Sequence, residues 1–288
     1  MSNSFRSLLV IAAALWLCPA HAADTFKNGG PYVPTPQVVV DKMLQFASVA
    51  EKDFVIDLGS GDGVIVLTAA SRFKASGMGV DIDADLVKLS NDSARKLDVA
   101  DRVRFAQLDV FKADLSRASV VTLYLLPSMM LDLRPKVFNE LKPGARVVSH
   151  DYHFGDWTPD DQITFDVPEK EKINGVPKAT IYLWHVPARI AGKWQLKVAG
   201  GETYELTLRQ RFQAIDGSVA VGGRSLRASQ TALRGNDFSF ALPDAKGAAR
   251  FAGRVKDNAM DGVVELPGAA APARWSAVRT AAAKVISE

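Results

Sequence analysis

The stretch Val55-Ile56-Asp57-Leu58-Gly59-Ser60-Gly61-Asp62-Gly63 joins a short apolar run to three glycines at alternate positions, and a helical pattern begins at Val64. Glycine has no Cβ, so a turn built from it can bend tightly and let a ligand approach the main chain. A buried strand that enters such a turn and continues as a helix is typical of a doubly wound sheet. The three glycines alone are also compatible with an ordinary flexible turn.

The surrounding sequence supports the sheet. Short apolar runs alternate with amphipathic stretches from residue 38 to about residue 187, as in a parallel sheet with crossover helices. The expected strands are 54–56, 77–80, 103–108, 120–125 and 146–149, and the expected helices are 38–49, 64–73, 84–97 and 129–141. Runs 163–167 and 179–186 flank a polar stretch with Asn174-Gly175 and predict an antiparallel edge hairpin. We therefore predict a Rossmann-like α/β domain of five parallel strands plus that hairpin.

The pattern changes after Pro187 to short alternating runs separated by Gly, Asn and Asp, at the roughly 8- to 12-residue spacing of antiparallel strands. These runs are 204–208, 218–221, 226–233, 238–242, 250–255 and 262–266. They predict a small all-β domain over 188–288, a barrel or half-barrel meander. Residues 267–273 are expected to form a loop, and the final alanine run a frayed tail. The domain is expected to be either a recognition module or a scaffold.

Composition excludes several protein classes. Of the 288 residues, 48% are hydrophobic and 23% charged, so the chain is neither disordered nor fibrous. Lys and Arg total 35 against 32 Asp and Glu, and a net charge of +3 is too small to indicate nucleic acid as the main partner. The single cysteine, Cys18, directly follows the first apolar run, so removal of this N-terminal segment would exclude disulfides and thiolate metal sites.

The N-terminal segment resembles an export signal. Arg6 precedes the apolar run 8–17, which has the length of a signal-peptide core, and Ala20-His21-Ala22 offers the small residues that signal peptidase reads. We predict a signal peptide over 1–22, cut between Ala22 and Ala23, and a periplasmic or secreted mature chain over 23–288. The alternatives are an uncleaved N-terminal membrane anchor and, less consistent with the bulky residues before Cys18, a lipoprotein.

Acidic residues close the two strands that follow the glycine turn. Asp81 follows the run 77–80, and Asp109 follows the run 103–108. An acid at the end of the second strand of a doubly wound sheet can accept hydrogen bonds from both hydroxyls of a ribose. Asp109 is expected along the same edge, where its carboxylate can accept from an adenine amino group. These positions predict an adenosine-binding site.

The glycine spacing separates this site from two other nucleotide sites. In a dinucleotide loop the third glycine comes three positions after the second, whereas here it comes after two, and the Asp62 carboxylate would repel phosphate. No Lys-Ser or Lys-Thr follows, so a phosphate-cradling P-loop is also excluded. A cofactor with ribose and adenine but no phosphate fits better. S-adenosylmethionine has this composition, and its sulfonium charge is compatible with Asp57 and Asp62.

Residues 31 to about 187 resemble class I S-adenosylmethionine-dependent methyltransferases, whose first motif matches 57–63. Together with Pro31-Tyr32-Val33-Pro34-Thr35-Pro36, Leu125-Leu126-Pro127-Ser128 and 141–149, this motif is similar to the membrane-anchored mitochondrial lysine N-methyltransferases of the ATP synthase c subunit and the adenine nucleotide carrier, and to their bacterial relatives. The resemblance covers the first domain only. It departs at Val64, where the family usually has arginine, and this difference concerns the acceptor more than the cofactor.

The resemblance implies a methyltransferase that uses S-adenosylmethionine and modifies a protein acceptor, such as a membrane or envelope protein. The predicted cofactor-binding residues are Tyr32, Thr35, Asp57, Gly59, Ser60, Gly61, Asp81, Ile82, Asp109 and Val110. In this family the loop after the fourth strand lines the acceptor channel, so Tyr124 and Ser128 are the candidate catalytic residues. The alternative is that Tyr124 is simply a strand residue packed in the core.

Methyl transfer from a sulfonium requires alignment in a water-poor pocket and no metal. His150 and His153 form a His-x-x-His pair on an extended segment, which points two side chains to opposite faces, and no third ligand is evident. We therefore expect no metal site, and His150-Asp151-Tyr152-His153 either lines the acceptor entrance or forms a structural turn. Trp157 and Trp184 are expected to be packing residues.

Export conflicts with the proposed chemistry, because the cofactor is made in the cytoplasm. The leading hypothesis is a protein (lysine) N-methyltransferase. The alternative is an exported protein that binds S-adenosylmethionine or S-adenosylhomocysteine without catalysis.

Overall fold

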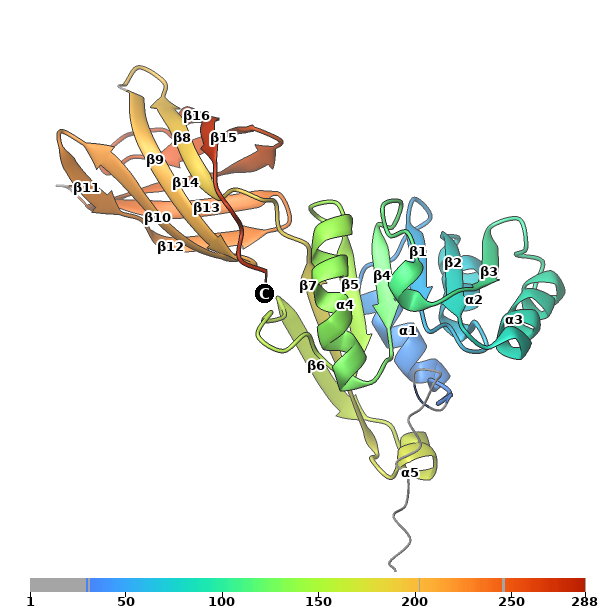
Figure 1. Ribbon diagram of the computed structural model, residues 1–288. Helices are drawn as coiled ribbons and strands as arrows, with labels where there is room; N and C mark the ends of the chain where they lie inside the picture. Colours follow the sequence, from blue (N-terminus) through green and yellow to red (C-terminus); the bar gives the residue numbers. More distant parts are fainter. Residues whose placement is uncertain (1–29, 31, 202, 245–246, 288) are drawn as a thin grey trace, which may run out of the picture.

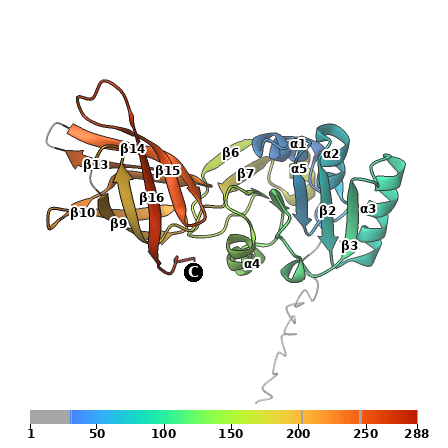
Figure 2. The same cartoon turned by 90° about the horizontal axis from the view of Figure 1, so that it is seen from above.

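The computed structural model describes residues 30, 32–201, 203–244 and 247–287, which form two sheets side by side (Figures 1 and 2). The predicted signal segment 1–22 and its Cys18 lie outside the described residues. None of the described helices is both long enough and apolar enough to cross a bilayer.

The first sheet has seven strands in the order β3-β2-β1-β4-β5-β7-β6. These strands are β1 Phe54–Leu58, β2 Ser76–Asp81, β3 Val103–Gln107, β4 Val120–Leu123, β5 Arg146–His150, β6 Asp161–Asp166 and β7 Lys178–His185. Strands β1 to β5 are parallel to one another, whereas β7 runs antiparallel to both β5 and β6. The predicted sheet of five parallel strands with an antiparallel edge hairpin is confirmed.

Helices cover both faces of this sheet. They are α1 Gln37–Phe46, α2 Val64–Phe73, α3 Ala84–Lys96, α4 Pro127–Glu140 and α5 Glu169–Asn174, with a short 3-10 helix η1 at Val110–Lys112. Side chains alternate along a strand, so Val55 packs on the face covered by α1 and α2, and Ile56 packs on the opposite face with α4. Burial on both faces explains the near-continuous apolar strands that identified the sheet in the sequence.

Local signals fix the ends of two helices near the strand ends. The Asp83 carboxylate caps α3 by accepting hydrogen bonds from the backbone amides of Asp85 and Leu86. Pro127 is the first residue of α4, a position where its missing N–H costs nothing. Consequently β4 ends at Leu123, two residues earlier than predicted, and α4 begins two residues earlier than predicted.

The connection between β6 and β7 is longer than a tight turn. Helix α5 occupies the polar stretch between these strands, and Gly175 ends it in the left-handed region at φ 76°. In Figure 1, α5 lies at the end of the sheet where the arrowheads of the parallel strands point. This short helix thus reaches the edge at which the acidic strand ends gather.

The second sheet has nine strands in the order β11-β10-β9-β8-β16-β15-β14-β13-β12, and neighbouring strands are antiparallel. They are β8 Gly192–Val198, β9 Thr203–Arg211, β10 Ala214–Val221, β11 Arg224–Arg227, β12 Ser229–Arg234, β13 Asp237–Asp244, β14 Gly247–Lys256, β15 Ala259–Glu265 and β16 Ala273–Ala282. The Thr231 hydroxyl of β12 donates to the Ile215 carbonyl of β10 (2.8 Å), so the sheet curls almost into a barrel. Buried aromatic side chains, including Trp194, Phe240 and Trp275, fill its interior.

The all-β fold class is confirmed, but details differ from the prediction. The predicted strand 226–233 is divided at Ala228 into β11 and β12, and β8 was not among the predicted runs. The expected frayed alanine tail was wrong, because the run as far as Ala282 belongs to β16. This strand pairs with β8 and β15 and turns Trp275 and Ala277 into the core. Tertiary pairing overrides the weak β-propensity of alanine there.

A phenylalanine from the β9–β10 turn joins the two sheets. Phe212 stacks on Trp157 with ring centroids 5.4 Å apart and meets the Phe138 ring edge-on at 5.5 Å, so it belongs to the core of the first sheet. Trp157 and Trp184 are both fully buried, as expected of packing residues.

Candidate active site

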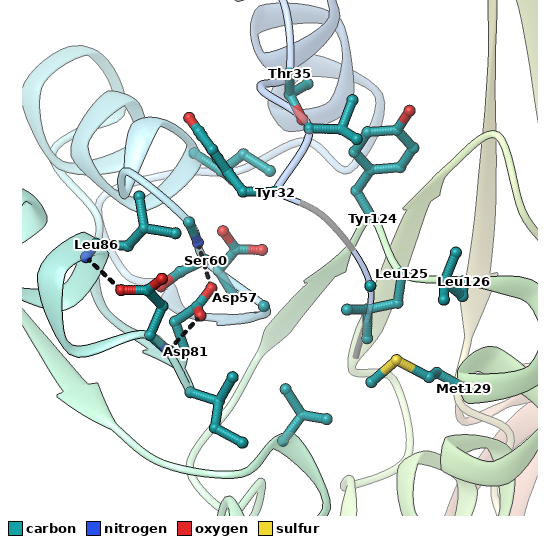
Figure 3. A pocket seen from close by; sticks show the side chains of 18 of the residues that line it. Tyr32, Thr35, Asp57, Ser60, Asp81, Leu86, Tyr124, Leu125, Leu126 and Met129 are labelled. Atoms are coloured by element: carbon teal, nitrogen blue, oxygen red, sulfur yellow. Dashed lines mark hydrogen bonds between the residues drawn. The ribbon is translucent and has the colours of Figure 1, made fainter. Parts of the chain in front are cut away.

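A cleft of about 510 Å³ opens at the carboxyl ends of β1, β2 and β4, next to η1 (Figure 3). One side is lined by the glycine loop and by acidic residues, and the other side by aromatic and aliphatic residues from the β4–α4 loop and the segment after β5. No lysine or arginine occurs among the described residues that line it.

The glycine loop is closely surrounded. Gly61 has φ 53°, and a Cβ on it would lie 2.5 Å from the Tyr32 ring. A Cβ on Gly59, at φ 77°, would lie 2.6 Å from the side chain of Leu125. Glycine is required at both positions, for its conformation and for the space that a side chain would fill.

Asp81 connects the end of β2 to this loop. One carboxylate oxygen accepts from the backbone amide of Gly61 (2.8 Å), and the other accepts from the backbone amide of Asp83 (3.0 Å). The side chain is half-buried and lines the cleft, as its predicted contact with the ribose requires.

Asp57 lies beneath the loop with its side chain buried. The Thr122 hydroxyl donates to its carboxylate at 2.6 Å. Burial, together with the negative charges of Asp81 and Asp62, raises the pKa of Asp57 to about 7 although the Thr122 hydrogen bond opposes the shift. A cationic ligand would favour the ionised form of this carboxyl group. The nearby Ser60 hydroxyl is buried without a hydrogen-bond partner among the described residues.

Asp109 marks the far end of the cleft. It accepts from the backbone amide of Phe111 (3.0 Å) as the cap of η1, and Val110 is buried beside it. Ile82 lines the same region with 45% of its surface exposed. Neither Asp81 nor Asp109 is buried away from the cleft.

All ten predicted cofactor-binding residues line this one cleft: Tyr32, Thr35, Asp57, Gly59, Ser60, Gly61, Asp81, Ile82, Asp109 and Val110. The segment before α1 contributes Tyr32 and Thr35, which approach the loop from outside the sheet (Figure 3). Burial and the Asp62 carboxylate raise the pKa of Tyr32, so its phenol stays protonated at neutral pH.

The opposite wall contains Tyr124, the first residue after β4. Its ring lies 4.1 Å from the His150 ring and is stacked at 6.3 Å from Tyr152. Burial and the Asp151 charge raise the pKa of Tyr124 to about 12, with a hydrogen bond to Asn174 opposing the shift. Tyr124 is therefore a protonated phenol at neutral pH, and it lines the cleft opposite the glycine loop.

The structure does not place Ser128 beside Tyr124 in the cleft. Ser128 is exposed on the first turn of α4 and is not among the lining residues. The physical reason is Pro127, which starts the helix there, so that Leu126 and Met129 face the cleft instead.

Sequence reasoning missed several lining residues, among them Leu126, Met129 and Phe111. Leu126 belonged to the quoted Leu125-Leu126-Pro127-Ser128 motif, which was the available signal. In the His150-Asp151-Tyr152-His153 segment, Tyr152 reaches the cleft while His150 is buried behind Tyr124. No group of three potential metal-ligating side chains occurs within the described ranges.

The residues present fit a phosphate-free adenosyl cofactor with a positive charge. The loop excludes side chains, as a cradle for a ligand against the main chain requires, and acids stand where a ribose and an amino group can donate. The lining offers five carboxylates and no cationic side chain among its described residues, which would disfavour phosphate groups.

This site on this sheet defines a class I S-adenosylmethionine-dependent methyltransferase. Residues 57–161 match the ANTKMT methyltransferase domain. A protein-lysine N-methyltransferase of Saccharolobus islandicus (strain REY15A) is 39% identical over 155 residues, which cover 54% of this chain and 92% of that protein. The chain belongs to the methyltransferase family that includes this archaeal enzyme.

Other similar proteins match a smaller part of their own length. The human lysine N-methyltransferase of the ATP synthase c subunit is 33% identical over 131 residues, covering 45% of this chain and 55% of the human protein. Among solved structures, an RNA methyltransferase from Salinibacter ruber in complex with S-adenosyl-L-homocysteine has 49% identity and a TM-score of 0.49, covering 55% of this chain and 96% of that one.

Proposed function

We propose that the chain is a protein-lysine N-methyltransferase. The observation that carries the proposal is the contrast between the two walls of the cleft. The acidic wall suits a cationic cofactor, whereas the opposite wall of Tyr124, Leu126, Met129 and Tyr152 is uncharged and suits the alkyl chain of a lysine. The name of the archaeal relative, a protein-lysine N-methyltransferase, supports the same acceptor.

Some residues of the cleft would hold the cofactor, and others would orient the acceptor. When bound, S-adenosylmethionine supplies a methyl group activated by a sulfonium. The glycine loop, Asp81 and Asp109 would hold its adenosine, and Asp57 would offset its positive charge. Tyr124 would orient the acceptor amine as a neutral phenol, since its raised pKa keeps it protonated at neutral pH and so unable to accept a proton. The apolar wall would keep water away and favour the uncharged, nucleophilic amine.

The rim of the cleft supports an acceptor with an apolar surface. Five lining residues are unusually exposed for large hydrophobic side chains: Tyr32, Ile82, Phe111, Leu126 and Tyr152. Exposed apolar side chains gathered around one cleft suit contact with the apolar surface of a protein or membrane. We therefore propose a membrane or envelope protein as the acceptor.

We also propose that the protein acts outside the cytoplasm, on the strength of its N-terminal sequence. The test is cell fractionation followed by N-terminal sequencing of the mature chain. Recovery from the periplasm with Ala23 as first residue is the expected result, and a cytoplasmic chain that retains residue 1 would refute export.

The acceptor is tested with the purified full chain, S-adenosylmethionine carrying a labelled methyl group, and membrane extracts of the source cells. After acid hydrolysis of the labelled material, we expect the label in methylated lysine. Label confined to RNA, or to another amino acid, would refute the lysine assignment while leaving methyl transfer in place.

A further inference from the structure

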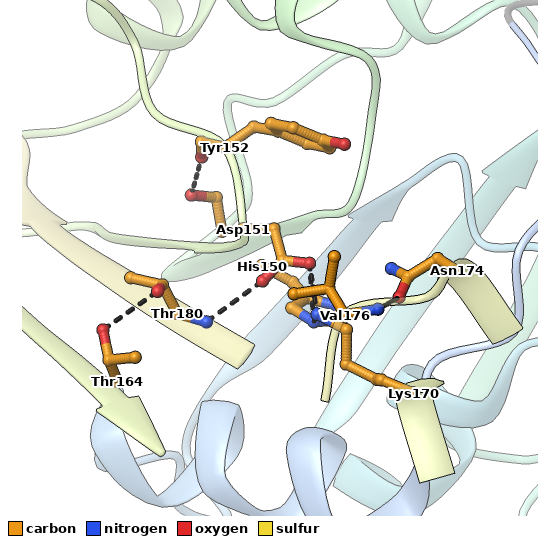
Figure 4. Close-up of polar contacts among 9 residues, drawn as sticks. His150, Asp151, Tyr152, Thr164, Lys170, Asn174, Val176 and Thr180 are labelled. Atoms are coloured by element: carbon orange, nitrogen blue, oxygen red, sulfur yellow. Dashed lines mark hydrogen bonds and ion pairs between the residues drawn. The ribbon is translucent and has the colours of Figure 1, made fainter. Parts of the chain in front are cut away.

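A lysine is buried beside the acceptor wall. Lys170, on α5, has 1% of its surface exposed, although lysine is almost never fully buried without a partner. Its ammonium donates to a carboxylate oxygen of Asp151, and its Nζ lies 3.2 Å from Nε2 of His150 (Figure 4). Two successive residues at the end of β5 thus hold this side chain.

Asp151 is itself held rigidly. Its second carboxylate oxygen accepts from the backbone amide of Thr180 on β7 (3.0 Å), and its backbone adopts the left-handed conformation at φ 63°. The Asp151 amide also donates to the Thr180 carbonyl (2.7 Å). The Thr180 hydrogen bond therefore still holds the carboxylate if the ammonium of Lys170 is removed.

The Asp151–Lys170 pair contacts the wall of the cleft through His150. That side chain is fully buried, its ring packs 4.1 Å from Tyr124, and its Nδ1 has no hydrogen-bond partner among the described residues. Asn174 follows Lys170 by four residues, so the two share a face of α5, and Asn174 lies close enough to Tyr124 to oppose the rise in the Tyr124 pKa. One face of this helix thus supports both the Asp151–Lys170 pair and the cleft-lining Tyr124.

We propose that Lys170 is a positioning residue for methyl transfer: its ammonium neutralises Asp151 behind the Tyr124–His150 wall, so that the acceptor amine does not meet an uncompensated carboxylate. The inference rests on the proposed lysine acceptor. Its basis is electrostatic, since a nearby carboxylate stabilises an ammonium and a nearby ammonium destabilises one. Only the neutral amine is nucleophilic, so the balance of these two charges sets the pH at which the acceptor reacts.

The charged and titratable groups around Lys170 are few. His150 at the end of β5 and Asp151 directly after it face Lys170, Tyr124 directly after β4 lies behind His150, and β7 contributes the uncharged Thr180. On α5 itself, Glu169, Glu171 and Lys172 are exposed. Burial and the charge of Lys170 lower the pKa of His150 to about 4, against the opposing effect of Asp151, so this imidazole is neutral at physiological pH.

Two single substitutions test the proposal because they change the local charge in opposite directions. Lys170→Met leaves the Asp151 carboxylate uncompensated. In a plot of single-turnover rate against pH, the rising limb should therefore move to higher pH by about one unit. Asp151→Asn leaves the ammonium uncompensated and should move the same limb downward by a similar amount. The double variant should return the limb to its wild-type position. Lys172→Met, on the exposed side of the same helix, is the matched control and should leave the limb unmoved.

Two further measurements distinguish an effect of the altered charge from an effect on folding. Calorimetry with S-adenosylhomocysteine should give wild-type affinity for each variant, since neither the α5 residues nor Asp151 are among the described residues that line the cleft. NMR titration of the His150 ring should show its pKa rising from about 4 in Lys170→Met, independently of turnover. If Lys170→Met loses cofactor binding through misfolding, the downward shift in Asp151→Asn decides the question, because an Asn oxygen can still accept from Thr180.

The outcomes distinguish the inference from the proposed function. A wild-type enzyme that methylates no lysine refutes the proposed function, and the inference falls with it. Suppose instead that the wild-type enzyme methylates lysine. If the pH limbs of Asp151→Asn and Lys170→Met then coincide with the wild-type limb, or shift in the same direction, the role of Lys170 is overturned and the proposed function stands. Opposite shifts that cancel in the double variant establish the role of Lys170.

Discussion

The carboxylate of Asp81 accepts a 2.8 Å hydrogen bond from the backbone amide of Gly61, so the acid at the end of one strand fixes the glycine loop at the end of its neighbour. β1 and β2 are paired in parallel, and this pairing brings the two strand ends together. The same carboxylate therefore has two roles: it shapes the loop, and it offers the oxygens that the resemblance assigns to the ribose.

Replacing Asp81 with Asn should weaken cofactor binding. An amide has one acceptor oxygen where the carboxylate has two, and hydrogen bonds to charged groups contribute about 1.5–3 kcal/mol each, so we expect affinity for S-adenosylhomocysteine to fall between about tenfold and a hundredfold. Isothermal titration calorimetry measures this loss. Asp85→Asn, at an exposed position on the first turn of α3 outside the cleft, is the control. Equal affinities of the two variants would contradict the assignment of Asp81.

Gly61→Ala should displace Tyr32 from the cleft. Its new Cβ would lie 2.5 Å from the Tyr32 ring in a backbone at φ 53°. Gly222 is a matched control, because it has φ 54° and nothing within 4 Å of the corresponding Cβ. Both variants carry the cost of a left-handed alanine, but only Gly61→Ala should lose cofactor affinity, by about tenfold or more, which is about 1.4 kcal/mol. If Gly222→Ala reduced binding equally, contact with Tyr32 would not be the cause.

The pKa of Asp57 predicts a pH-dependent stability difference. Its pKa is about 7 in the folded protein and 3.8 for the free side chain, so between these values the folded state binds more protons than the unfolded state. This group therefore lowers stability as pH rises from 3.8 to 7 and has a constant effect above 7. Asp57→Asn can still accept from Thr122 but carries no charge.

We thus expect the advantage of Asp57→Asn over the wild-type chain to be absent below pH 3.8, to grow as far as pH 7 and then to level off, reaching at most a few kcal/mol. Urea unfolding of the cofactor-free proteins across this range measures the difference. A gap between the two proteins that stays constant with pH would show that folding does not raise the pKa of Asp57.

Tyr124 and Ser128 should differ in their effect on catalysis. Tyr124 lines the cleft, whereas Ser128 is exposed outside it. Tyr124→Ala removes the orienting ring and should lower kcat by about tenfold or more, in the range of general catalytic contributions of positioned groups. Ser128→Ala should change kcat by less than about twofold, as for an exposed surface position. A larger loss in Ser128→Ala would restore the role predicted from sequence.

Phe212 should couple the stability of the two sheets. Its side chain is 2% exposed and stacks on Trp157 across the boundary. Phe212→Ala should cost about 3–5 kcal/mol, as for other buried aromatic residues, and separate the thermal unfolding of the two sheets. Phe212→Leu keeps apolar volume and serves as the control. Differential scanning calorimetry compares them, and a single unshifted transition for Phe212→Ala would refute the coupling.

The cofactor side of the site was predictable from sequence because its geometry follows from strand order. The glycine loop, Asp81 and Asp109 each follow an apolar run, and the carboxyl ends of neighbouring parallel strands meet at one edge. Two rules, the meeting of parallel strand ends at one edge and the need for bare main chain near a ligand, were therefore enough for these residues, whereas Tyr32 and Thr35 came from the family resemblance.

The acceptor side depended on contacts that no local pattern encodes. Whether Ser128 faced the cleft depended on where α4 begins, and a shift of one or two residues on a helix turns a side chain to another face. Lys170 reached Asp151 only because β7 pairs between β5 and β6. A charged residue in a polar stretch indicates an exposed face, so its burial was invisible in the sequence.

In chain order β8 is the first strand of the second sheet and β16 is the last, and the two are hydrogen-bonded neighbours. During synthesis, every strand of the cofactor-binding sheet is therefore complete long before β16 leaves the ribosome. Strand β16 fills the gap between β8 and β15 in the second sheet. A nonsense codon late in the gene would spare the catalytic half and abolish closure of the other.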